Sequence, residues 1–209
     1  MISGSMIEAV LFDFGGVLAD EGFRNGLHAI AGANGLDPER FFLLARELVY
    51  STGYLTGRVD EHAYWNALRS DAGISGNDAD LREIILEGFS LRTWMLDIVR
   101  QLKDGGIRLF ILSDQTNWLD ELEERNHFFY LFEKVFNSFH TGKSKRDPRL
   151  FHDVLSTINL SGEHVLFIDD TCEHIVMAQG IGLQTIWYQG KNDFSEKMNR
   201  LFPALLDQK

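Results

Sequence analysis

A carboxylate stands directly after the first apolar run of the chain. Residues 9–12 read Ala-Val-Leu-Phe, Asp13 follows, and the chain then reaches Gly15 and Gly16. A short, continuous apolar run is typical of a buried parallel strand, and open α/β sheets bind their ligands at the carboxyl ends of such strands. An aspartate in that position can coordinate a cation or attack an electrophile, and the glycines let the backbone approach a bound group closely.

Three later apolar segments also end in polar residues. The first is followed by a hydroxyl and a carboxylate, the second by a lysine that precedes a helical pattern, and the third by two adjacent carboxylates. Because the carboxyl ends of parallel strands lie at one edge of a sheet, we expect these side chains to share a site with Asp13. The segments and the polar residues after them are 107–112 with Ser113 and Asp114, 135–138 with Lys145, and 165–168 with Asp169 and Asp170.

Taken in order, the four motifs resemble those of the haloacid dehalogenase (HAD) superfamily. Members of that superfamily have an aspartate nucleophile, a Ser or Thr, a Lys and an acidic pair, each at a strand end. The likeness covers nearly the whole chain, and the residues around the motifs are similar to the branch that includes the glucose-1-phosphatase type of sugar phosphatases. The resemblance implies an α/β fold, in which a Rossmann-like parallel sheet forms the core and a four-helix cap of the C1 type is inserted.

By the same resemblance, Asp13 is the expected nucleophile, and Ser113 and Lys145 are expected to bind the oxygens of the transferring phosphoryl group. A phosphate monoester is a dianion that repels an anionic nucleophile, so a cation must first offset the repulsion. Mg²⁺ is the implied cofactor, because it prefers carboxylate and carbonyl oxygens while it keeps water and substrate oxygens in its octahedron. The implied metal ligands are Asp13, the main-chain carbonyl of Gly15, and Asp169 or Asp170, and further substrate contacts are expected from Gly16, Asp114, Arg146 and Tyr54.

The expected activity is that of a phosphoric monoester hydrolase. It would hydrolyse a small phosphorylated metabolite, with a sugar phosphate as one candidate, through an aspartyl-phosphate intermediate. One alternative is a metal-free 2-haloacid dehalogenase that uses Asp13 to displace halide from carbon, although such a site gains nothing from the adjacent carboxylates Asp169 and Asp170. A second alternative is a non-catalytic module that keeps the fold and binds phosphate without turnover.

The chain departs from the commoner family pattern at three positions. Gly15 stands where an aspartate usually protonates the leaving group, and general acid–base help of that kind is worth about 10²- to 10⁴-fold. A carboxylate from the following segment, Asp20 or Glu21, is a candidate substitute. Arg146 replaces the proline that usually follows the motif lysine, and Asp114 stands where asparagine is more frequent, so these two charges could offset each other.

The segment 19–92 differs from the strands around it, because its apolar residues repeat at helical spacing and predict four short helices. In the resembled family, an insertion at this point is a cap that closes over the catalytic strand ends. The loop 50–57, rich in hydroxyl groups and glycine, is the candidate for substrate discrimination, with an ordinary helix connection as the alternative. The helix starts are indicated by Asp37-Pro38, by Asp60, and by Asp78 or Asp80.

These patterns divide the chain into two expected parts. Residues 6–18 and 93–209 form the expected core, and residues 19–92 form the expected cap. Residues 1–5, which precede a second methionine, resemble a cloning remnant and are excluded from reasoning about the fold.

The composition favours a cytoplasmic enzyme of ordinary size. Of the 209 residues, 31 are acidic and 20 are basic, and the formal net charge of −11 disfavours nucleic acids and anionic membranes as partners. No apolar run is long enough to span a bilayer, and no secretory signal is present. The single cysteine, Cys172, excludes an internal disulfide and is expected to be a small buried side chain. The expected partner is a small phosphorylated molecule, and the sequence leaves the oligomeric state open.

Overall fold

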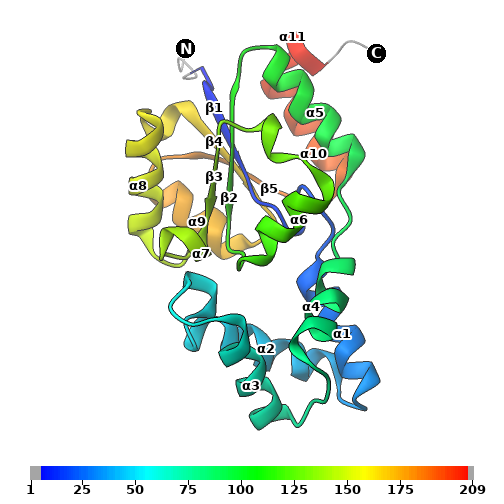
Figure 1. Ribbon diagram of the computed structural model, residues 1–209. Coiled ribbons are helices and arrows are strands. Elements are labelled where there is room, and N and C mark those ends of the chain that lie inside the picture. The colour runs from blue at the N-terminus through cyan, green and yellow to red at the C-terminus, as the bar shows by residue number, and fades with distance from the viewer. Residues whose placement is uncertain (1–5, 207–209) are drawn as a thin grey trace.

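Five short strands form one parallel sheet in the computed structural model, which describes residues 6–206. The strand order is β3-β2-β1-β4-β5 (Figure 1), and the predicted α/β fold with a parallel sheet is confirmed. The prediction for residues 1–5 lies outside the described residues. The strands are β1 (Ala9–Phe12), β2 (Arg108–Ser113), β3 (Lys134–Asn137), β4 (Val165–Asp169) and β5 (Gln184–Trp187).

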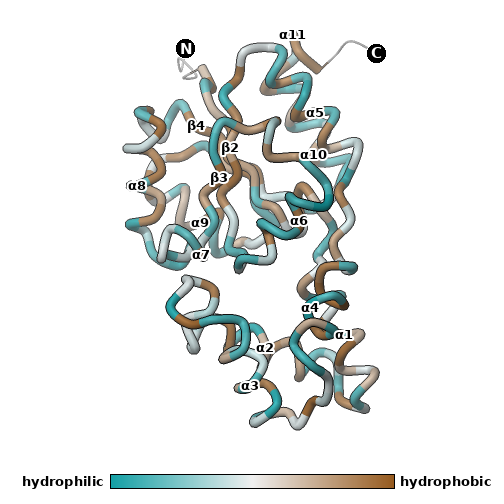
Figure 2. The backbone as a smooth tube through the Cα atoms, in the orientation of Figure 1, coloured by the Kyte–Doolittle hydropathy of each residue, from teal (hydrophilic) through white to brown (hydrophobic). Residues whose placement is uncertain are grey.

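Helices cover both faces of the sheet, because its central strands are apolar on both sides (Figure 2). Side chains alternate between the faces, so Ala9 and Leu11 of β1 pack with α8 and α9, whereas Val10 and Phe12 pack with α5, α6 and α10. The core helices are α5 (Thr93–Asp104), α6 (Trp118–Asn126), α7 (Ser138–Thr141), α8 (Pro148–Ile158), α9 (Cys172–Gly180), α10 (Lys191–Leu201) and α11 (Pro203–Leu206), and the short 3₁₀ turns are η2 (Phe129–Leu131) and η3 (Gly162–His164).

The order of the strands determines where the polar strand ends meet. Strand β1 pairs with β2 on one side and with β4 on the other, so Phe12 lies opposite both Ile111 and Ile168. The chain therefore continues from β1 to β2 on one side of β1, and it later places β4 on the opposite side of β1. The carboxyl ends of β1 and β4 are the topological switch point of the sheet, where open α/β folds have their ligand crevice.

Four helices between β1 and α5 form a separate bundle beside the carboxyl edge of the sheet, called here the helical insert (Figure 1). The four helices predicted within 19–92 are thus present, while the division into a core and a closing cap stays a prediction. The two ends of the insert lie close together, because Ala19 forms an isolated β-bridge with Leu91. The insert comprises α1 (Gly22–Ala33), α2 (Pro38–Ser51), η1 (Tyr54–Thr56), α3 (Glu61–Ala72) and α4 (Asp78–Glu87).

Side-chain caps begin three of these helices. Asp37 and Asp60 cap α2 and α3 as predicted, since each accepts a hydrogen bond from the backbone N–H three residues later, at 2.8 and 2.9 Å. Helix α4 is capped by Asn77 in the same way at 2.9 Å, so the prediction that Asp78 or Asp80 is the cap is wrong. Both aspartates lie in the first turn instead, where the helix dipole favours negative charge.

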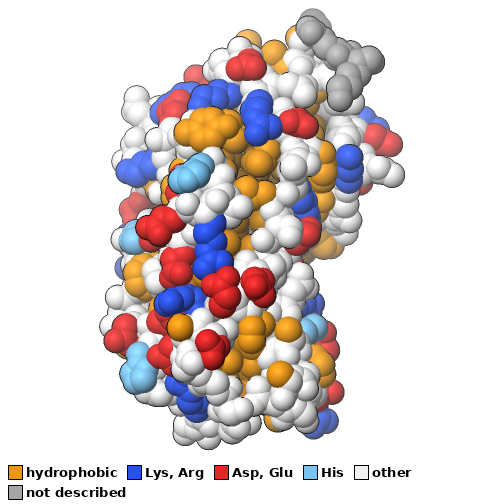
Figure 3. Space-filling model, turned by 45° about the vertical axis from the view of Figure 1, so that its right-hand side comes forward, with side chains coloured by type: hydrophobic (Ala, Val, Ile, Leu, Met, Phe, Trp, Pro, Cys, Tyr) orange, Lys and Arg blue, Asp and Glu red, His pale blue; other side chains and the backbone are white. Residues whose placement is uncertain are grey.

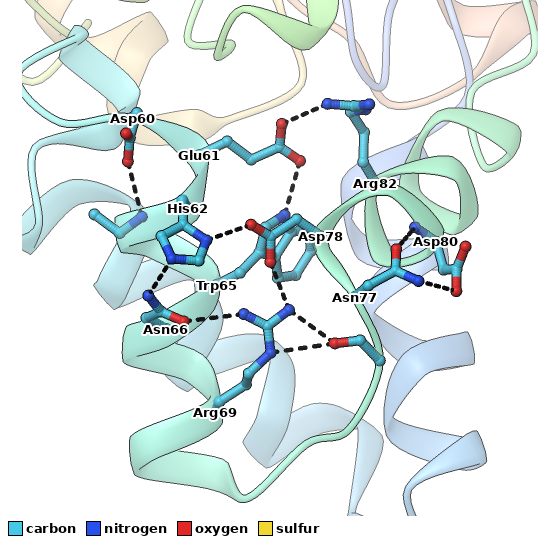
Figure 4. Close-up of polar contacts among 12 residues, drawn as sticks. Asp60, Glu61, His62, Trp65, Asn66, Arg69, Asn77, Asp78, Asp80 and Arg82 are labelled. Atoms are coloured by element: carbon cyan, nitrogen blue, oxygen red, sulfur yellow. Dashed lines mark hydrogen bonds and ion pairs between the residues drawn. The ribbon is translucent and has the colours of Figure 1, made fainter.

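A polar network ties α3 to the start of α4 (Figure 4). The Arg69 guanidinium donates to Asp78 at 2.5 Å and to the carbonyl of Gly76 at 2.8 Å, and Nδ1 of His62 lies 2.6 Å from the other Asp78 oxygen. Burial alone would raise the pKa of Asp78, but the bonds from His62 and Arg69 outweigh it and lower that pKa. The network fixes the loop between the two helices and gives the insert a defined shape.

The outer surface carries charges of both signs. On the face seen in Figure 3, acidic and basic side chains are interspersed rather than separated into a basic area. Cys172 is exposed in the first turn of α9, so the prediction of a buried thiol is wrong. Among residues 6–206, no helix has both the length and the apolar character needed to cross a membrane.

Glycines on one side of α1 allow it to approach α4 closely. A Cβ at Gly26 would lie 2.6 Å from the Cα of Ile85 in α4, and a Cβ at Gly22 would lie 2.6 Å from the backbone nitrogen of Phe89, two residues after the end of α4. Backbone atoms cannot move aside as a flexible side chain can. At Gly32, on the outer side of the same helix, a Cβ would meet nothing within 4 Å.

The variant Gly26→Ala should lower the free energy of unfolding by about 1–3 kcal/mol, because the added methyl group overpacks the contact between α1 and α4. The matched control Gly32→Ala should instead raise it by about 0.5–1 kcal/mol, since alanine is the better helix former. Urea unfolding followed by circular dichroism measures both values. Changes of the same sign at the two glycines would contradict the close packing of these helices.

Candidate active site

A buried lysine lies between two carboxylates at the carboxyl edge of the sheet. The Nζ of Lys145 is 2.8 Å from Oδ1 of Asp13 and 2.6 Å from Oδ2 of Asp169, and the side chains of Lys145 and Asp169 have no exposed surface. Asp13 follows β1, Asp169 ends β4, and Lys145 comes from the loop between α7 and α8. Burial alone would lower the pKa of Lys145, but the two carboxylates outweigh burial and raise it above its usual value. The lysine is therefore held in its charged form.

The carboxylate of Asp13 is bonded through one of its two oxygens. Oδ1 accepts hydrogen bonds from the Ser113 hydroxyl at 2.8 Å and from the backbone N–H of Phe14 at 2.7 Å, besides its contact with Lys145. No donor among the described residues bonds to Oδ2. The bonds to Oδ1 fix the orientation of the carboxylate, and Oδ2 stays available to a cation or an electrophile.

Asp13, Asp169 and Asp170 together form a cluster suited to a divalent cation. Each residue offers one oxygen, and these oxygens lie within 4.8 Å of one another. Burial raises the pKa of Asp13 despite the opposing effect of Lys145, and burial and the Asp169 charge raise the pKa of Asp170. Three carboxylates beside one lysine thus carry excess negative charge, which a divalent cation would offset. Oxygen ligands of this kind suit Mg²⁺.

Thr171 and His174, which follow the acidic pair in the sequence, orient the side chain of Asp169. The backbone N–H of Thr171 donates to its Oδ1 at 2.7 Å, and Nδ1 of His174 lies 3.2 Å from both of its oxygens. Although burial would raise the pKa of Asp169, Lys145 and His174 hold it well below its usual range. From the sequence alone, His174 had no assigned role, because no second histidine lies at the spacing that two metal ligands on one helix require. The available signal was its position in the first turn of the helix after the acidic pair.

A cavity of about 310 Å³ lies over these residues, between the sheet edge and the helical insert. The strand ends supply a polar floor, and the insert supplies a wall with aromatic, aliphatic and cationic side chains. Most wall residues could not be recognised from sequence, because apolar residues that pack inside a helical bundle and those that face a cavity have the same spacing. The lining residues of the core are Asp13, Gly15, Ser113, Asp114, Gln115, Thr116, Trp118, Asp170, Thr171 and His174, and those near or within the insert are Glu21, Phe23, Arg24, Phe42, Arg46, Val49, Tyr50 and Leu55.

The two glycines after β1 serve different purposes. Gly16 has a φ of +79°, and a Cβ there would lie 2.1 Å from Oδ2 of Asp170, so only glycine fits beside this carboxylate. The carbonyl of Gly16 accepts a hydrogen bond from Arg92, and Gly16 does not line the cavity. Gly15 does line the cavity, as its expected role at the metal site requires.

Asp114 joins the helical insert to two loops of the core. Its Oδ1 accepts from the Ser138 hydroxyl at 2.6 Å and from the backbone N–H of Lys145 at 2.8 Å, while its Oδ2 accepts from the Tyr50 hydroxyl at 2.9 Å. The Arg146 guanidinium lies over the Tyr50 ring, 3.7 Å from its centre. Within the described residues, Asp114 and Arg146 therefore each contact Tyr50 and form no ion pair with each other.

Besides Gly16, two more of the expected substrate contacts, Arg146 and Tyr54, lie outside the main cavity. Arg146 lines an adjacent cavity of about 300 Å³, which it shares with Lys145 and Tyr50. Tyr54 is fully buried, and its hydroxyl donates to Oδ1 of Asn117 at 2.6 Å. This burial contradicts the expected contact between Tyr54 and a substrate. Tyr50, at the start of the same candidate loop, lines the cavity instead.

Comparison with known sequences gives one family and several relatives. The family model of haloacid dehalogenase-like hydrolases matches residues 7–182. Drimenol cyclase drtB from Aspergillus calidoustus is 26% identical over 159 residues, which cover 73% of this chain and 29% of that protein. The sesquiterpene phosphatase astK from Aspergillus oryzae is 28% identical over 90 residues, which cover 43% of this chain and 46% of that protein. The matched part thus spans less than half the length of each of these two relatives.

Comparison with solved structures identifies the same fold. A HAD family enzyme from Bacteroides thetaiotaomicron, crystallised with magnesium and inorganic phosphate, superimposes with a TM-score of 0.72. The two chains are 20% identical, and the alignment covers 91% of this chain and 98% of that one. The family match includes all four of the polar motifs that follow the strands. The chain therefore belongs to the haloacid dehalogenase-like hydrolases.

Proposed function

We propose that this hydrolase is a Mg²⁺-dependent phosphatase, which cleaves a small phosphorylated metabolite through an aspartyl-phosphate on Asp13. The observation that carries the proposal is the cluster of three carboxylates and Lys145 at the carboxyl edge of the sheet, from which Asp13 and Asp170 line the main cavity. The magnesium and phosphate bound by the Bacteroides enzyme support this choice of metal and of substrate class. The excess of carboxylates also favours a metal site over a metal-free dehalogenase.

The chain's own residues would prepare Asp13 for attack. Ser113 and Lys145 fix the orientation of its carboxylate before a substrate binds, which lowers the entropic cost of reaching phosphorus. The same hydroxyl and ammonium groups are the proposed donors to the transferring oxygens. Bound Mg²⁺ would supply the charge that lets a carboxylate approach a phosphate dianion, held by Asp13, the carbonyl of Gly15 and the acidic pair.

The side chains in the wall of the cavity would contact the organic part of the substrate. Phe23, Phe42 and Leu55 would pack against an apolar face of that part, and Arg24 and Arg46 would attract its polar or anionic groups. A sugar phosphate can satisfy both through the apolar face of its ring and its hydroxyl groups. The similarity to a sesquiterpene phosphatase adds terpenyl phosphates to the candidates.

The purified protein should release inorganic phosphate from at least one member of a panel of sugar, terpenyl and other small phosphate esters. Release should require Mg²⁺ and should stop in excess chelator, because the clustered carboxylates need a cation before a dianion can approach. The variant Asp13→Asn should show no turnover, since it lacks the nucleophile. A colorimetric phosphate assay measures all three conditions.

The same protein preparation also tests the two alternative functions, the dehalogenase and the non-catalytic binding module. Release of halide from a 2-haloacid without added metal would support the dehalogenase and contradict the phosphatase. Phosphate binding that Mg²⁺ strengthens, without turnover of any ester, would support the binding module. Circular dichroism of Asp13→Asn checks that a loss of turnover is not a loss of folding.

The variant Lys145→Met should lower the free energy of unfolding by about 3–5 kcal/mol at neutral pH, because it leaves two carboxylates buried without their cation. The pKa of Asp169 is held low in the folded protein, so the stability that this group contributes to the wild type is still present at about pH 5 and is lost only below the ordinary pKa of an aspartate. In the variant, the carboxylates gain protons more readily. The difference in stability between the two proteins should therefore shrink between neutral pH and about pH 5.

Urea unfolding in the presence of chelator measures this difference at both pH values. The matched control is Lys143→Met, which removes a partly exposed lysine whose partner is Asp153 at the surface. This control should change the free energy of unfolding by no more than about 1 kcal/mol. If Lys145→Met lowers the free energy of unfolding by the same amount at both pH values, the result would argue against a buried charge cluster.

A further inference from the structure

The cavity contains one carboxyl group that the proposed attack by Asp13 leaves unused. Glu21, the residue directly before α1, lines the cavity together with Asp13 and Gly15. Its Oε1 lies 3.8 Å from the position that a Cβ on Gly15 would occupy. Gly15 has no side chain of its own, so the carboxyl group of Glu21 reaches the space beside the nucleophile loop.

Ester cleavage at this site needs a group that can transfer protons. The leaving oxygen must gain a proton as its bond to phosphorus breaks, and the water that later attacks the aspartyl-phosphate must lose one. Lys145 is paired with Asp13 and Asp169, and Asp114 already accepts three hydrogen bonds. His174 is turned through Nδ1 toward Asp169. These groups are engaged in holding the site together.

The surroundings of Glu21 suit a group that alternates between acid and base. Burial, reinforced by the charge of Asp170, raises the pKa of Glu21 to about 7, while Arg24 and Lys145 oppose the shift. The groups that face it thus come from the loop after β4, from α1 and from the loop before α8. A carboxyl group that titrates near neutral pH is efficient in both directions of proton transfer.

The neighbouring carboxylate does not share these properties. The side chain of Asp20 is 52% exposed, forms an ion pair with Arg92 at 3.1 Å and does not line the cavity. Asp20 and Glu21 are adjacent in sequence, but only Glu21 is on the cavity side of the segment that leads into the helical insert. Asp20 is therefore a matched control for it.

We propose that Glu21 is the general acid and general base of this site, in the place of a carboxylate at position 15. The assignment rests on the proposed phosphatase function and adds a catalytic residue to it. In the first step, an oxygen of Asp13 bonds to phosphorus, the bond from phosphorus to the ester oxygen breaks, and that oxygen takes the proton of Glu21. In the second step, the Glu21 carboxylate takes a proton from water while the water oxygen bonds to phosphorus. The bond between phosphorus and Asp13 then breaks, its electron pair returns to Asp13, and inorganic phosphate is released.

The test compares kcat/KM for two probes that differ in their need for a proton. Phenyl phosphate has a poor leaving group, whereas 2,4-dinitrophenyl phosphate releases a stable anion. The variant Glu21→Gln should lower kcat/KM for phenyl phosphate by about 100-fold or more, and by less than about tenfold for 2,4-dinitrophenyl phosphate. For the wild type, kcat/KM on phenyl phosphate should fall as the pH rises, because only protonated Glu21 can donate, and Glu21→Gln should lack this fall. Asp20→Asn should stay within about twofold of the wild type on both probes.

Restoring a carboxylate at position 15 provides a second test. A Cβ at Gly15 would lie 3.3 Å from the side-chain nitrogen of Gln115 and 3.4 Å from the ring of Phe89, so it requires a shift of a few tenths of an ångström in a side chain and none in the backbone. In the Glu21→Gln background, Gly15→Asp should recover at least about tenfold in kcat/KM for phenyl phosphate, whereas the isosteric Gly15→Asn should not.

The outcomes separate this inference from the function on which it rests. If Asp13→Asn keeps the activity of the wild type, or if the wild type releases no phosphate from either probe or from any ester of the panel, the phosphatase proposal fails and the role of Glu21 fails with it. If Asp13→Asn is inactive while Glu21→Gln slows both probes equally or neither, only the role of Glu21 is overturned. Equal recovery by Gly15→Asp and Gly15→Asn would also overturn it.

Discussion

A single ammonium group, that of Lys145, holds together two buried carboxylates at the ends of neighbouring strands. Without it, the ends of β1 and β4 would bring Asp13 and Asp169 into direct repulsion. Much of the surrounding geometry serves to deliver this lysine, because Asp114 binds its backbone N–H and so fixes the loop that carries it. The third carboxylate, that of Asp170, exceeds what one lysine can balance, and an additional cation would offset this excess.

The helical insert is fixed to the core on two sides. Near the cavity, the Tyr50 hydroxyl bonds to Asp114, the same residue that fixes the lysine loop. Farther away, α4 and α6 are joined by ion pairs, of which Arg125 with Glu83 is bidentate at 2.7 Å. The wall of the cavity and its catalytic floor therefore share one hydrogen-bond system, so a change in the position of α2 acts directly on the loop that holds Lys145.

The sequence was sufficient to predict the parallel sheet and the residues at its strand ends. Continuous apolar runs and the order of the motifs carry that information, because parallel strands have their carboxyl ends at one edge. The same patterns could not distinguish Tyr50 from Tyr54, since the loop between them decides which ring is buried. They also left Asp20 and Glu21 equivalent, because the choice depends on which way one short segment turns at the Ala19 bridge. Contacts between distant segments, such as that of Tyr50 with Asp114, have no local signature.

The position of Glu21 separates two tasks that a carboxylate at position 15 would combine on one loop. Asp13 and the carboxylates around it belong to the sheet, whereas Glu21 directly precedes α1, which packs against α4 within the helical insert. A displacement of the insert would carry the proton donor away while the nucleophile stayed in place. In that arrangement, an open enzyme exposed to solvent would lack the group that activates water, and the aspartyl-phosphate would be protected until the insert returned.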